Sequence, residues 1–409
     1  MAAFRFVHVA DVHLDARFKS RDEHLRERLA GALRDSFSNA VELALREGVH
    51  AFLVAGDLFH TPEIAYGTER FLINEFEKLA GAGIAVFYAH GNHDPGGAAS
   101  PLAGIRWPDG VEVFRDGTPR AVEVKDADGR PVGRITGAGH ATSAEGENLA
   151  ACFPAAVGPL PEVALLHANV EGGQTAGEHE RYAPCVAADL EGKGYDYWAL
   201  GHIHLRQAID ARVAARYSGC VLGLYRNETG PKGALFVEVE RGAAPKVVFQ
   251  ATAPLLWERI EVNLGGAEDV DAARERIAAA IGERFGGAGD VLVTVGLLGE
   301  TPAAPRLRDR ETRVTMEEEI AGEAGLDLLK LETGNLRSPV DEEEMRLPPL
   351  GELLDFVAVL REGREPIAPL APEKLAAAPD KAAAREEYLR SLLDGAEEEL
   401  IRRMWRDEP

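Results

Sequence analysis

The chain has 409 residues. Domains with a single hydrophobic core are usually shorter than this, so two or three domains are expected. Its 45% hydrophobic and 28% charged content is ordinary for a globular protein. The 68 acidic and 45 basic residues give a net charge of −23, which argues against a protein that coats nucleic acid with its general surface. A nuclease stays possible, because bound metal ions can neutralise phosphate locally.

Targeting and redox signals indicate an intracellular protein. The first residues lack the succession of basic, apolar and small residues that marks a secretory signal, and the apolar run at 4–10 is too short for one. No apolar stretch approaches the roughly 20 residues that cross a bilayer, so no membrane association is expected. Three widely spaced cysteines argue against a disulfide framework or a structural zinc site. We expect a cytoplasmic location.

Strand-length apolar runs alternate with amphipathic helix patterns through the first 253 residues. Strands are predicted at 4–10, 51–55, 84–89, 163–166 and 195–200, and helices at 22–47 and 68–79. Antiparallel pairs are predicted at 120–125 with 132–136 and at 234–238 with 246–249. The pattern predicts an α/β fold, a β-sandwich of mixed sheets flanked by helices, as a first domain at 1–253.

Two further parts are predicted after this domain. Residues 254–337 have the pattern of a small α/β module, with strands at 256–262, 291–297 and 326–331 and helices at 268–285 and 316–324. Residues 338–409 are predicted to be helical, at 350–360 and 382–405. A linker with four prolines, Pro366, Pro369, Pro372 and Pro379, separates the two helices.

Polar side chains follow five of the predicted strands, at the point where each strand ends. They are Asp11-Val12-His13, Gly56-Asp57, Gly91-Asn92-His93-Asp94, His167 and Gly201-His202-Ile203-His204. Sites in α/β sheets assemble at the carboxyl ends of strands, where loops from distant sequence converge. Mixed imidazole and carboxylate ligands suit manganese, iron or zinc better than magnesium alone. The glycines before Asp57, Asn92 and His202 are predicted to let the backbone turn sharply there.

A single Asp or His at a strand end is more often a turn or surface residue than a ligand. The chain has 12 histidines, so some proximity is expected by chance. Chance does not explain five polar groups that each follow an apolar strand. The sequence therefore favours one shared site that contains all five. The remaining histidines are given structural roles; they are His8, His24, His50, His60, His90, His140 and His179.

These motifs resemble those of the calcineurin-like metallophosphoesterase superfamily, and more closely its DNA-repair exonuclease branch, the SbcD and YhaO-like subunits. The complete series is Ala10-Asp11-Val12-His13-Leu14, Gly56-Asp57-Leu58-Phe59, Gly91-Asn92-His93-Asp94, His167 and Gly201-His202-Ile203-His204. The segment 217–233, which includes Arg226-Asn227-Glu228-Thr229-Gly230, resembles the loop and closing strands of YhaO-like members. The resemblance covers about residues 4–250 and is architectural only beyond 254.

The resemblance implies two divalent metal ions, with manganese as the expected metal. One ion would be held by Asp11, His13, Asp57 and His204, and the other by Asp57, Asn92, His167 and His202. Cations roughly 4 Å apart would clamp a phosphate and share a water whose pKa falls towards ~7, giving a bridging hydroxide. His93 would orient the phosphate and protonate the leaving oxygen.

The same resemblance implies a DNA exonuclease or endonuclease subunit. A phosphatase or cyclic-nucleotide phosphodiesterase of the superfamily is the alternative. The protein-phosphatase branch usually continues Gly-Asp with Asp-Arg-Gly and ends its third motif in Glu, where this chain has Leu58-Phe59-His60-Thr61 and Asp94. Small cyclic-nucleotide diesterases seldom carry so much chain beyond the catalytic domain. A scaffold without catalysis is disfavoured because His93 and all the ligand positions are retained.

The 254–337 module would lie where relatives carry a capping domain that helps to grip DNA. Its most basic stretch offers four candidate phosphate contacts, Arg306, Arg308, Arg310 and Arg313, with a solvated strand or loop as the equally weighted alternative.

The last part of the chain carries two apolar stripes, which either fold back on their own domains or dock a partner. The first consists of Leu350, Leu353, Leu354, Val357 and Leu360, widened by Phe356 and Val359; the second consists of Leu389, Leu392, Leu393, Ala396, Leu400 and Met404. The resemblance favours docking to the coiled coil of an SbcC-like ATPase subunit. DNA is the other expected partner, and a homodimer is left open.

Overall fold

The computed structural model describes residues 3–18, 23–172, 181–288, 290–339, 350–367, 382–393 and 396. By its internal contacts the chain divides into two compact units. The first comprises Met1–Ile260, Ile281–Val295 and Glu318–Lys330, and the second Glu261–Ala280, Gly296–Glu317 and Leu331–Pro409.

Two six-stranded sheets form the centre of the first unit. One has the order β12-β11-β1-β2-β3-β4, from β12 (Lys246–Ala251), β11 (Gly233–Val239), β1 (Phe4–Val9), β2 (Ala51–Ala55), β3 (Ala85–Ala89) and β4 (Val111–Phe114). The other has the order β5-β6-β7-β8-β10-β9, from β5 (Arg120–Lys125), β6 (Pro131–Ala138), β7 (Glu162–His167), β8 (Tyr197–Gly201), β10 (Ala215–Tyr217) and β9 (Gln207–Ala208). Strands β1 to β4 are parallel, as are β6, β7, β8 and β10. The antiparallel pairs are β1 with β11, β11 with β12, β5 with β6, and β9 with β10.

Each sheet has one face against the other sheet and one against helices. Along β1, Phe4 and Phe6 belong to the core between the sheets, whereas Val7 and Val9 belong to the core under the helices. This alternation follows from the two-residue period of a strand, and burial on both faces explains why the sequence runs apolar throughout. The fold is therefore an α/β sandwich of mixed sheets flanked by helices, as the sequence predicts.

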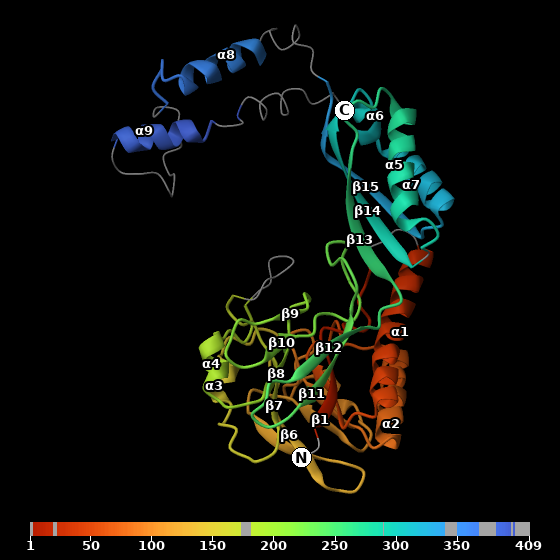
Figure 1. Cartoon of the computed structure of the whole chain (residues 1–409), viewed down its shortest axis with the longest axis vertical. Helices are drawn as coiled ribbons and strands as arrows, with labels where there is room; N and C mark the ends of the chain where they lie inside the picture. The colour runs from red at the N-terminus through yellow and green to blue at the C-terminus, as the bar shows by residue number, and fades with distance from the viewer. Residues whose placement is uncertain are drawn as a thin grey trace. The chain divides into compact units, whose positions relative to one another are not determined.

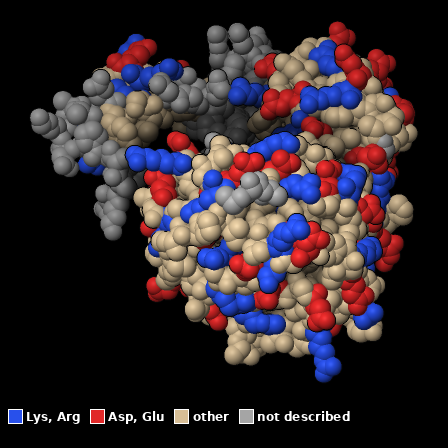
Figure 2. All heavy atoms as spheres, turned by 60° about the horizontal axis from the view of Figure 1, so that its bottom comes forward, with Lys and Arg blue, Asp and Glu red and all other residues tan. Residues whose placement is uncertain are grey.

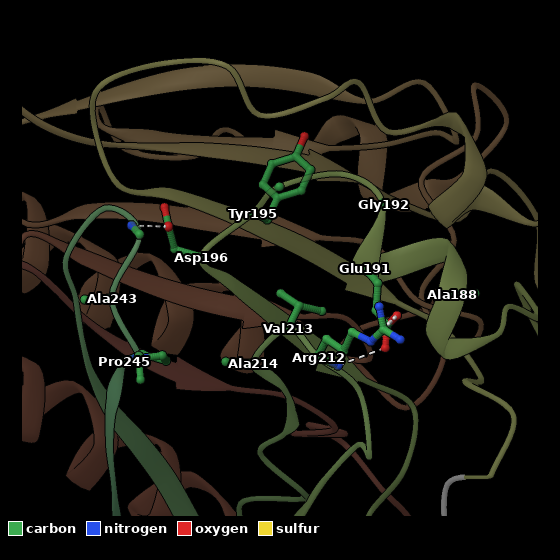
Figure 3. Close-up of a pocket in the computed structure, with 13 residues that line it drawn as sticks. Ala188, Glu191, Gly192, Tyr195, Asp196, Arg212, Val213, Ala214, Ala243 and Pro245 are labelled. Carbon is green, nitrogen blue, oxygen red and sulfur yellow. Dashed lines mark hydrogen bonds and ion pairs between the residues drawn. The ribbon is translucent and has the colours of Figure 1, made fainter.

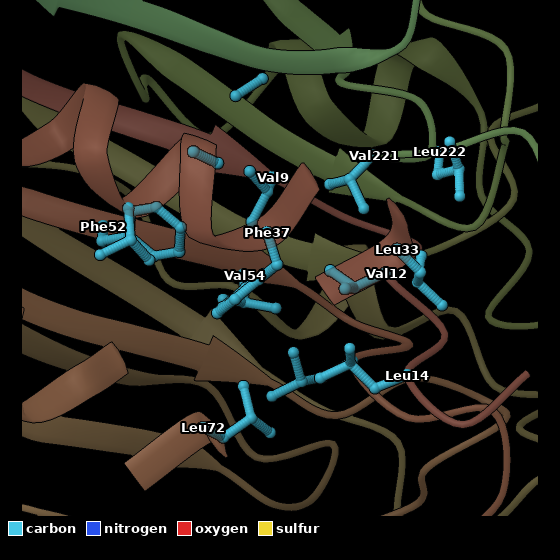
Figure 4. Packing of buried hydrophobic residues seen from close by; sticks show 14 of the residues in the cluster. Val9, Val12, Leu14, Leu33, Phe37, Phe52, Val54, Leu72, Val221 and Leu222 are labelled. Atoms are coloured by element: carbon cyan, nitrogen blue, oxygen red, sulfur yellow. The ribbon is translucent and has the colours of Figure 1, made fainter. Parts of the chain in front are cut away.

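Helices α1 (Glu23–Glu47) and α2 (Tyr66–Gly81) cover one side of the strands, and the short helices α3 (Leu149–Cys152) and α4 (Ala187–Glu191) lie on the other (Figure 1). On α1, Leu29, Leu33 and Phe37 follow a four-residue spacing and are buried. They join one apolar cluster with residues of the first sheet and of α2, part of which is seen in Figure 4. Each such side chain contributes about 1.5–3 kcal/mol by leaving water.

A third, three-stranded sheet has the order β13-β14-β15, from β13 (Leu256–Asn263), β14 (Val291–Glu300) and β15 (Leu328–Arg337). Its helices are α5 (Val270–Phe285), α6 (Ala304–Arg308) and α7 (Arg310–Ala324). The arginines from Arg306 to Arg313 therefore lie on helices, and only the strand-or-loop conformation given for the solvated alternative is wrong. Pro305 occupies the first turn of α6, where a missing N–H costs nothing, and the Asp309 carboxylate accepts the Thr312 N–H at the start of α7.

The described C-terminal residues include α8 (Leu350–Arg361) and α9 (Ala382–Ser391). Leu360, Ile367 and Leu389 form a small buried cluster, and the Ile367 N–H donates to Glu386 on α9. Phe356 and Leu392 stay exposed. The linker residues Pro369, Pro372 and Pro379 and the stripe residues Leu400 and Met404 lie outside the described residues.

Two further expectations can be compared with the structure. None of the helices that the structure describes has the length and apolar content to cross a bilayer. Cys152, Cys185 and Cys220 are all free, the first exposed and the others buried.

Candidate metal centre

The five sequence motifs converge at the carboxyl ends of β1, β2, β3, β7 and β8, all in the first unit. Backbone hydrogen bonds join the first two loops directly, because the Asp11 N–H donates to Gly56 O and the His13 N–H to Asp57 O. The parallel pairings of β1 with β2 and β3, and of β7 with β8, bring these ends to one edge of each sheet. Residues 191 positions apart, such as His13 and His204, thereby come into contact.

One part of the cluster consists of Asp11, His13 and His204, which offer ligand atoms within 4.8 Å of one another. The Nε2 atoms of His13 and His204 are 3.1 Å apart. Asp57 adjoins this group, with Oδ2 at 3.7 Å from His13 Nε2. All four side chains are buried.

The other part surrounds Asn92. Its Oδ1 lies 2.9 Å from His167 Nε2 and 3.2 Å from His202 Nδ1. The same His167 nitrogen is 3.5 Å from Asp57 Oδ2. Asp57 therefore adjoins both parts of the cluster, between the His13 side and the His167 side.

Hydrogen bonds on the far side of two rings determine which nitrogen faces the centre. His167 Nδ1 lies 2.9 Å from the carbonyl oxygen of Ala55, and His204 Nδ1 lies 2.6 Å from Glu228 Oε1. Both partners only accept, so each Nδ1 carries the proton and each Nε2 presents a lone pair. The His167 lone pair then faces the Asn92 oxygen, which is also an acceptor. Hydrogen-bond acceptors that face one another with no proton between them are typical of the ligands of a cation. These residues therefore fit divalent metal ions.

The backbone at these residues is held in a conformation that non-glycine residues rarely adopt. Positive φ angles occur at Asp11 (50°), His13 (52°), Asp57 (51°) and His202 (102°). Such residues cost about 1–3 kcal/mol each and gather at functional sites. The surrounding hydrogen bonds and burial must therefore maintain this geometry against local strain.

The glycines beside the motifs act in two ways. Gly56 has φ of 89°, so it makes the sharp turn that the sequence predicts. Gly91 and Gly201 are instead required by close approach. A Cβ at Gly91 would lie 2.2 Å from Asp57 Oδ1, and one at Gly201 would lie 1.8 Å from Ala55 O.

Burial dominates the electrostatics of the centre. It raises the pKa of Asp11 to about 7 and the pKa of Asp57 to about 6, and it lowers the pKa values of His13 and His167 well below their usual range. Burial is the largest single effect on His204 and opposes its protonation, but the hydrogen bond to Glu228 and the charges of Asp11, Glu228 and Asp57 together outweigh it and raise the pKa of that ring. The cluster thus holds buried carboxyl groups beside the neutral imidazoles of His13 and His167, and a cation would stabilise the ionised carboxylates and the imidazole lone pairs.

His93 lies at the rim of this cluster. Its Nδ1 is 3.0 Å from the carbonyl oxygen of His60, which commits that nitrogen as the donor and leaves Nε2 for other chemistry. The ring stacks on the His60 ring at 5.2 Å and meets the His13 ring edge-on at 4.7 Å. Its backbone N–H donates to Asp57 Oδ1. His60 is therefore part of the centre's surroundings, although packing or exposure is the role that the sequence favours for this residue beside a motif.

The other histidines have identifiable places. His8 pairs with the Tyr197 hydroxyl, His50 accepts the Arg5 N–H, and His140 Nε2 donates to the His167 carbonyl oxygen. His90 lies against Tyr88, and His24 is exposed on α1. His179 lies outside the described residues.

Sequence reasoning missed the roles of Asp94 and Glu228. The Asp94 carboxylate accepts the N–H groups of Phe59 and Gly91 and the Tyr88 hydroxyl, which ties two motif loops together. Burial, and after it the Asp57 carboxylate, raises the pKa of Asp94 to about 8, while these donors oppose the shift. Asp94 was visible in its motif, but only as the last residue of Gly-Asn-His-Asp. Glu228 lies 24 residues beyond His204, in a loop without periodic signal.

The four candidate arginines belong to the second unit. Arg306 and Arg308 are on α6, and Arg310 and Arg313 are on α7. Arg308 donates to Leu336 O, and Arg313 donates to Arg308 O. Arg306 and Arg310 are exposed.

A separate hollow of about 740 Å³ lies at the amino ends of β8 and β10, the opposite ends of the strands from the motifs (Figure 3). Asp196 on its wall is already paired with Arg241 and with the Gly242 N–H, and Glu191 accepts the Arg212 N–H. None of the motif residues lines this hollow.

Comparison with known proteins identifies two matching families. The calcineurin-like phosphoesterase family matches residues 4–206, and the middle domain of metallophosphoesterase YhaO matches residues 257–334. An uncharacterized metallophosphoesterase YhaO of Bacillus subtilis (strain 168) is 32% identical over 303 residues, covering 73% of this chain and 72% of that protein. The DNA double-strand break repair protein Mre11 of Aeropyrum pernix is 29% identical over 290 residues, covering 66% of each. Among solved structures, a dimetal phosphatase from Danio rerio aligns with a TM-score of 0.35 at 14% identity, covering 62% of this chain and 100% of that chain.

Proposed function

The chain belongs to the calcineurin-like phosphoesterase family, and we propose that it is a dimetal phosphodiesterase that cleaves DNA, as an exonuclease or endonuclease subunit in DNA repair or processing. The observation that carries the phosphoesterase chemistry is the set of acceptor atoms that face one another around Asp57 and Asn92. The choice of DNA is supported by the similarity to Mre11 proteins, which are described as DNA double-strand break repair proteins.

We assign two divalent metal ions, with manganese as the proposed metal, to the two parts of the cluster. Asp11, His13, Asp57 and His204 would hold one ion, and Asp57, Asn92, His167 and His202 the other. This assignment is supported by the position of Asp57 between the two groups of imidazoles. When bound, such cations supply positive charge to a phosphate and activate water as a nucleophile.

His93 is proposed as the general acid. Its Nδ1 is committed to the His60 carbonyl oxygen, so Nε2 is the nitrogen that would protonate the leaving oxygen of a cleaved ester. The hydrogen bond from the His93 backbone N–H to Asp57 Oδ1 holds His93 next to a proposed metal ligand.

The two residues after Gly56-Asp57 favour a diester over a monoester as the substrate. Leu58 and Phe59 are completely buried and contribute backbone N–H groups to Asp94. These positions pack the core and supply no arginine to grip the dianion of a phosphomonoester.

DNA affinity is expected to depend on a partner. The net charge is −23, and basic and acidic side chains are interspersed on the face shown in Figure 2. We propose that α8 and α9 dock an SbcC-like ATPase subunit, which would supply the missing phosphate contacts. This is supported by two exposed apolar side chains, Phe356 on α8 and Leu392 directly after α9, beside the small buried cluster of this helical pair.

The test is an assay of the purified chain with manganese on end-labelled single- and double-stranded DNA. A generic aryl phosphodiester, a phosphomonoester and a cyclic nucleotide are assayed alongside, each with a chelated control. We expect manganese-dependent cleavage of DNA and of the generic diester, with little action on the monoester. Preference for the monoester would indicate a phosphatase instead, and action on the cyclic nucleotide alone would indicate a cyclic-nucleotide phosphodiesterase.

A further inference from the structure

Glu228 is a buried carboxylate that contacts a proposed metal ligand from outside the cluster. Its side chain is 5% exposed, and Oε1 lies 2.6 Å from His204 Nδ1. The other oxygen, Oε2, accepts the N–H groups of Leu224 (2.6 Å) and Tyr225 (3.2 Å). Three N–H donors therefore face the two oxygens of this side chain.

The loop that carries Glu228 is itself fixed to the backbone of His204. The Cys220 N–H donates to His204 O at 3.2 Å. A Cβ at Gly219, which has φ of 73°, would lie 2.8 Å from the same carbonyl oxygen. Glu228 consequently connects the ring of His204 to a segment that already packs against its main chain.

We propose that Glu228 is a positioning residue, which holds His204 in the Nδ1–H tautomer and fixes the ring so that Nε2 faces Asp11 and His13. The consequence for metal binding rests on the proposed function, but the tautomer follows from this chain's own contacts. A carboxylate or carbonyl partner on the far nitrogen is the usual way in which proteins orient a ligating imidazole.

Glutamine cannot replace Glu228, although it has nearly the same shape. Its side chain offers one acceptor oxygen, whereas Glu228 receives donors on both oxygens. If the glutamine oxygen takes the two backbone N–H groups, its NH₂ faces His204 Nδ1 and favours the tautomer with the proton on Nε2. That tautomer presents no lone pair to Asp11 and His13. The reverse orientation sets an NH₂ group against two buried backbone donors.

The matched control is Glu162→Gln. Glu162 is also a buried carboxylate that accepts a backbone N–H, from Gly158 at 2.8 Å. It begins β7, at the opposite end of the strand from His167. This variant therefore reports the general cost of neutralising a buried carboxylate in the same unit.

The first measurement is ¹⁵N NMR of the histidine rings in the metal-free protein, at a pH well above the imidazole range, with His204 assigned by His204→Asn. We expect the Nδ1–H form in the unaltered chain and in Glu162→Gln. We expect loss of that form in Glu228→Gln, and its retention in Glu228→Asp, which keeps a carboxylate as the acceptor. A His204 tautomer unchanged in Glu228→Gln would overturn the proposal.

The second measurement is titration of the same proteins with manganese. Glu228→Gln should weaken one of two binding events by about 10–100-fold and leave the other close to its original affinity. Equal affinities in Glu228→Gln and the unaltered chain would refute the positioning of a metal ligand. A third outcome is that the unaltered chain binds no manganese while Glu228→Gln still loses the Nδ1–H tautomer of His204. That outcome would refute the proposed function and leave the positioning role of Glu228 in place. If Glu228→Gln does not fold, Glu228→Ala, which removes both acceptor oxygens, replaces it in both measurements, and an unchanged His204 tautomer in Glu228→Ala would overturn the proposal.

Discussion

At the scale of single residues, His93 and Asp57 should fail in different ways when they are replaced. His93→Ala is expected to lower turnover by roughly 10²–10⁴-fold, the range for loss of a general acid, with metal content unchanged. Asp57→Ala is expected to lose metal, because Asp57 lies between both groups of imidazoles. Elemental analysis of the two purified variants separates these outcomes. Loss of metal from His93→Ala would contradict its role as a residue that holds no metal.

The apparent affinity for manganese should rise with pH. Burial raises the pKa of Asp11 to about 7 and the pKa of Asp57 to about 6 in the metal-free chain, so a cation must displace protons below these values. The same shifts make the metal-free fold lose stability as the pH rises from the unfolded carboxyl range through about 6 and 7, since buried charge is unfavourable. Calorimetric titration across this range should therefore show affinity that increases and then levels off above about pH 7. Affinity independent of pH would contradict the assignment of these two carboxylates.

The motif residues could be located from the sequence because each follows an apolar strand. The strain at Asp11, His13, Asp57 and His202 could not, since positive φ at a non-glycine residue arises from tertiary contacts and has no local signature. Glu228 was equally hidden, because its hydrogen bond to His204 joins two segments that only the fold brings together.

At the scale of helices, α6 and α7 offer a test of DNA contact. Arg306 and Arg310 are the informative pair, because Arg308 and Arg313 already donate to carbonyl oxygens of their own unit. If both contact phosphate, replacing both with alanine should lower the slope of log affinity against log salt by roughly 2, equally for all sequences. A fluorescence binding titration at several salt concentrations measures this. An unchanged slope would leave these arginines as solvated surface residues.

The pair formed by α8 and α9 should bind a partner without acting in catalysis. Truncation after residue 340 is expected to abolish pull-down of an SbcC-like subunit and to retain manganese-dependent cleavage of a short substrate. Phe356→Asp changes an exposed side chain and should act in the same way, whereas Tyr66→Asp changes an exposed aromatic on α2 and serves as the control. Partner binding that survives the truncation would contradict the docking role, as would loss of basal cleavage in a folded truncated chain.

Elements with a clear apolar pattern were predicted well, and elements or ends without one were not. The strands β1, β2 and β7 and the helix α1 carry enough apolar residues for their period to be recognised. β10 has only three residues and exists because it pairs with β8 and β9. The helix α7 begins six residues before the predicted 316–324, since its first turn is polar and is started by Asp309.

At the scale of the whole molecule, the acidic charge is compatible with the proposed nuclease chemistry if a partner subunit supplies the affinity for DNA and the metal centre of this chain supplies the catalysis. The isolated chain should then bind DNA weakly at physiological salt, while its metal centre still cleaves short diesters. The domain boundaries at 253 and 337 stay predictions. The two compact units interleave along the sequence between Ile260 and Leu331, whereas the match to the YhaO middle domain is continuous from 257 to 334.

The central claim is that seven side chains from five strand ends form one centre for two metal ions that share Asp57. The most direct measurement is a crystal structure of the manganese-loaded chain with anomalous scattering recorded for manganese. We expect two anomalous peaks roughly 3.5–4 Å apart, one on each side of Asp57. The first should lie among Asp11, His13 and His204, and the second among Asn92, His167 and His202. A single peak, or two peaks away from Asp57, would contradict the account.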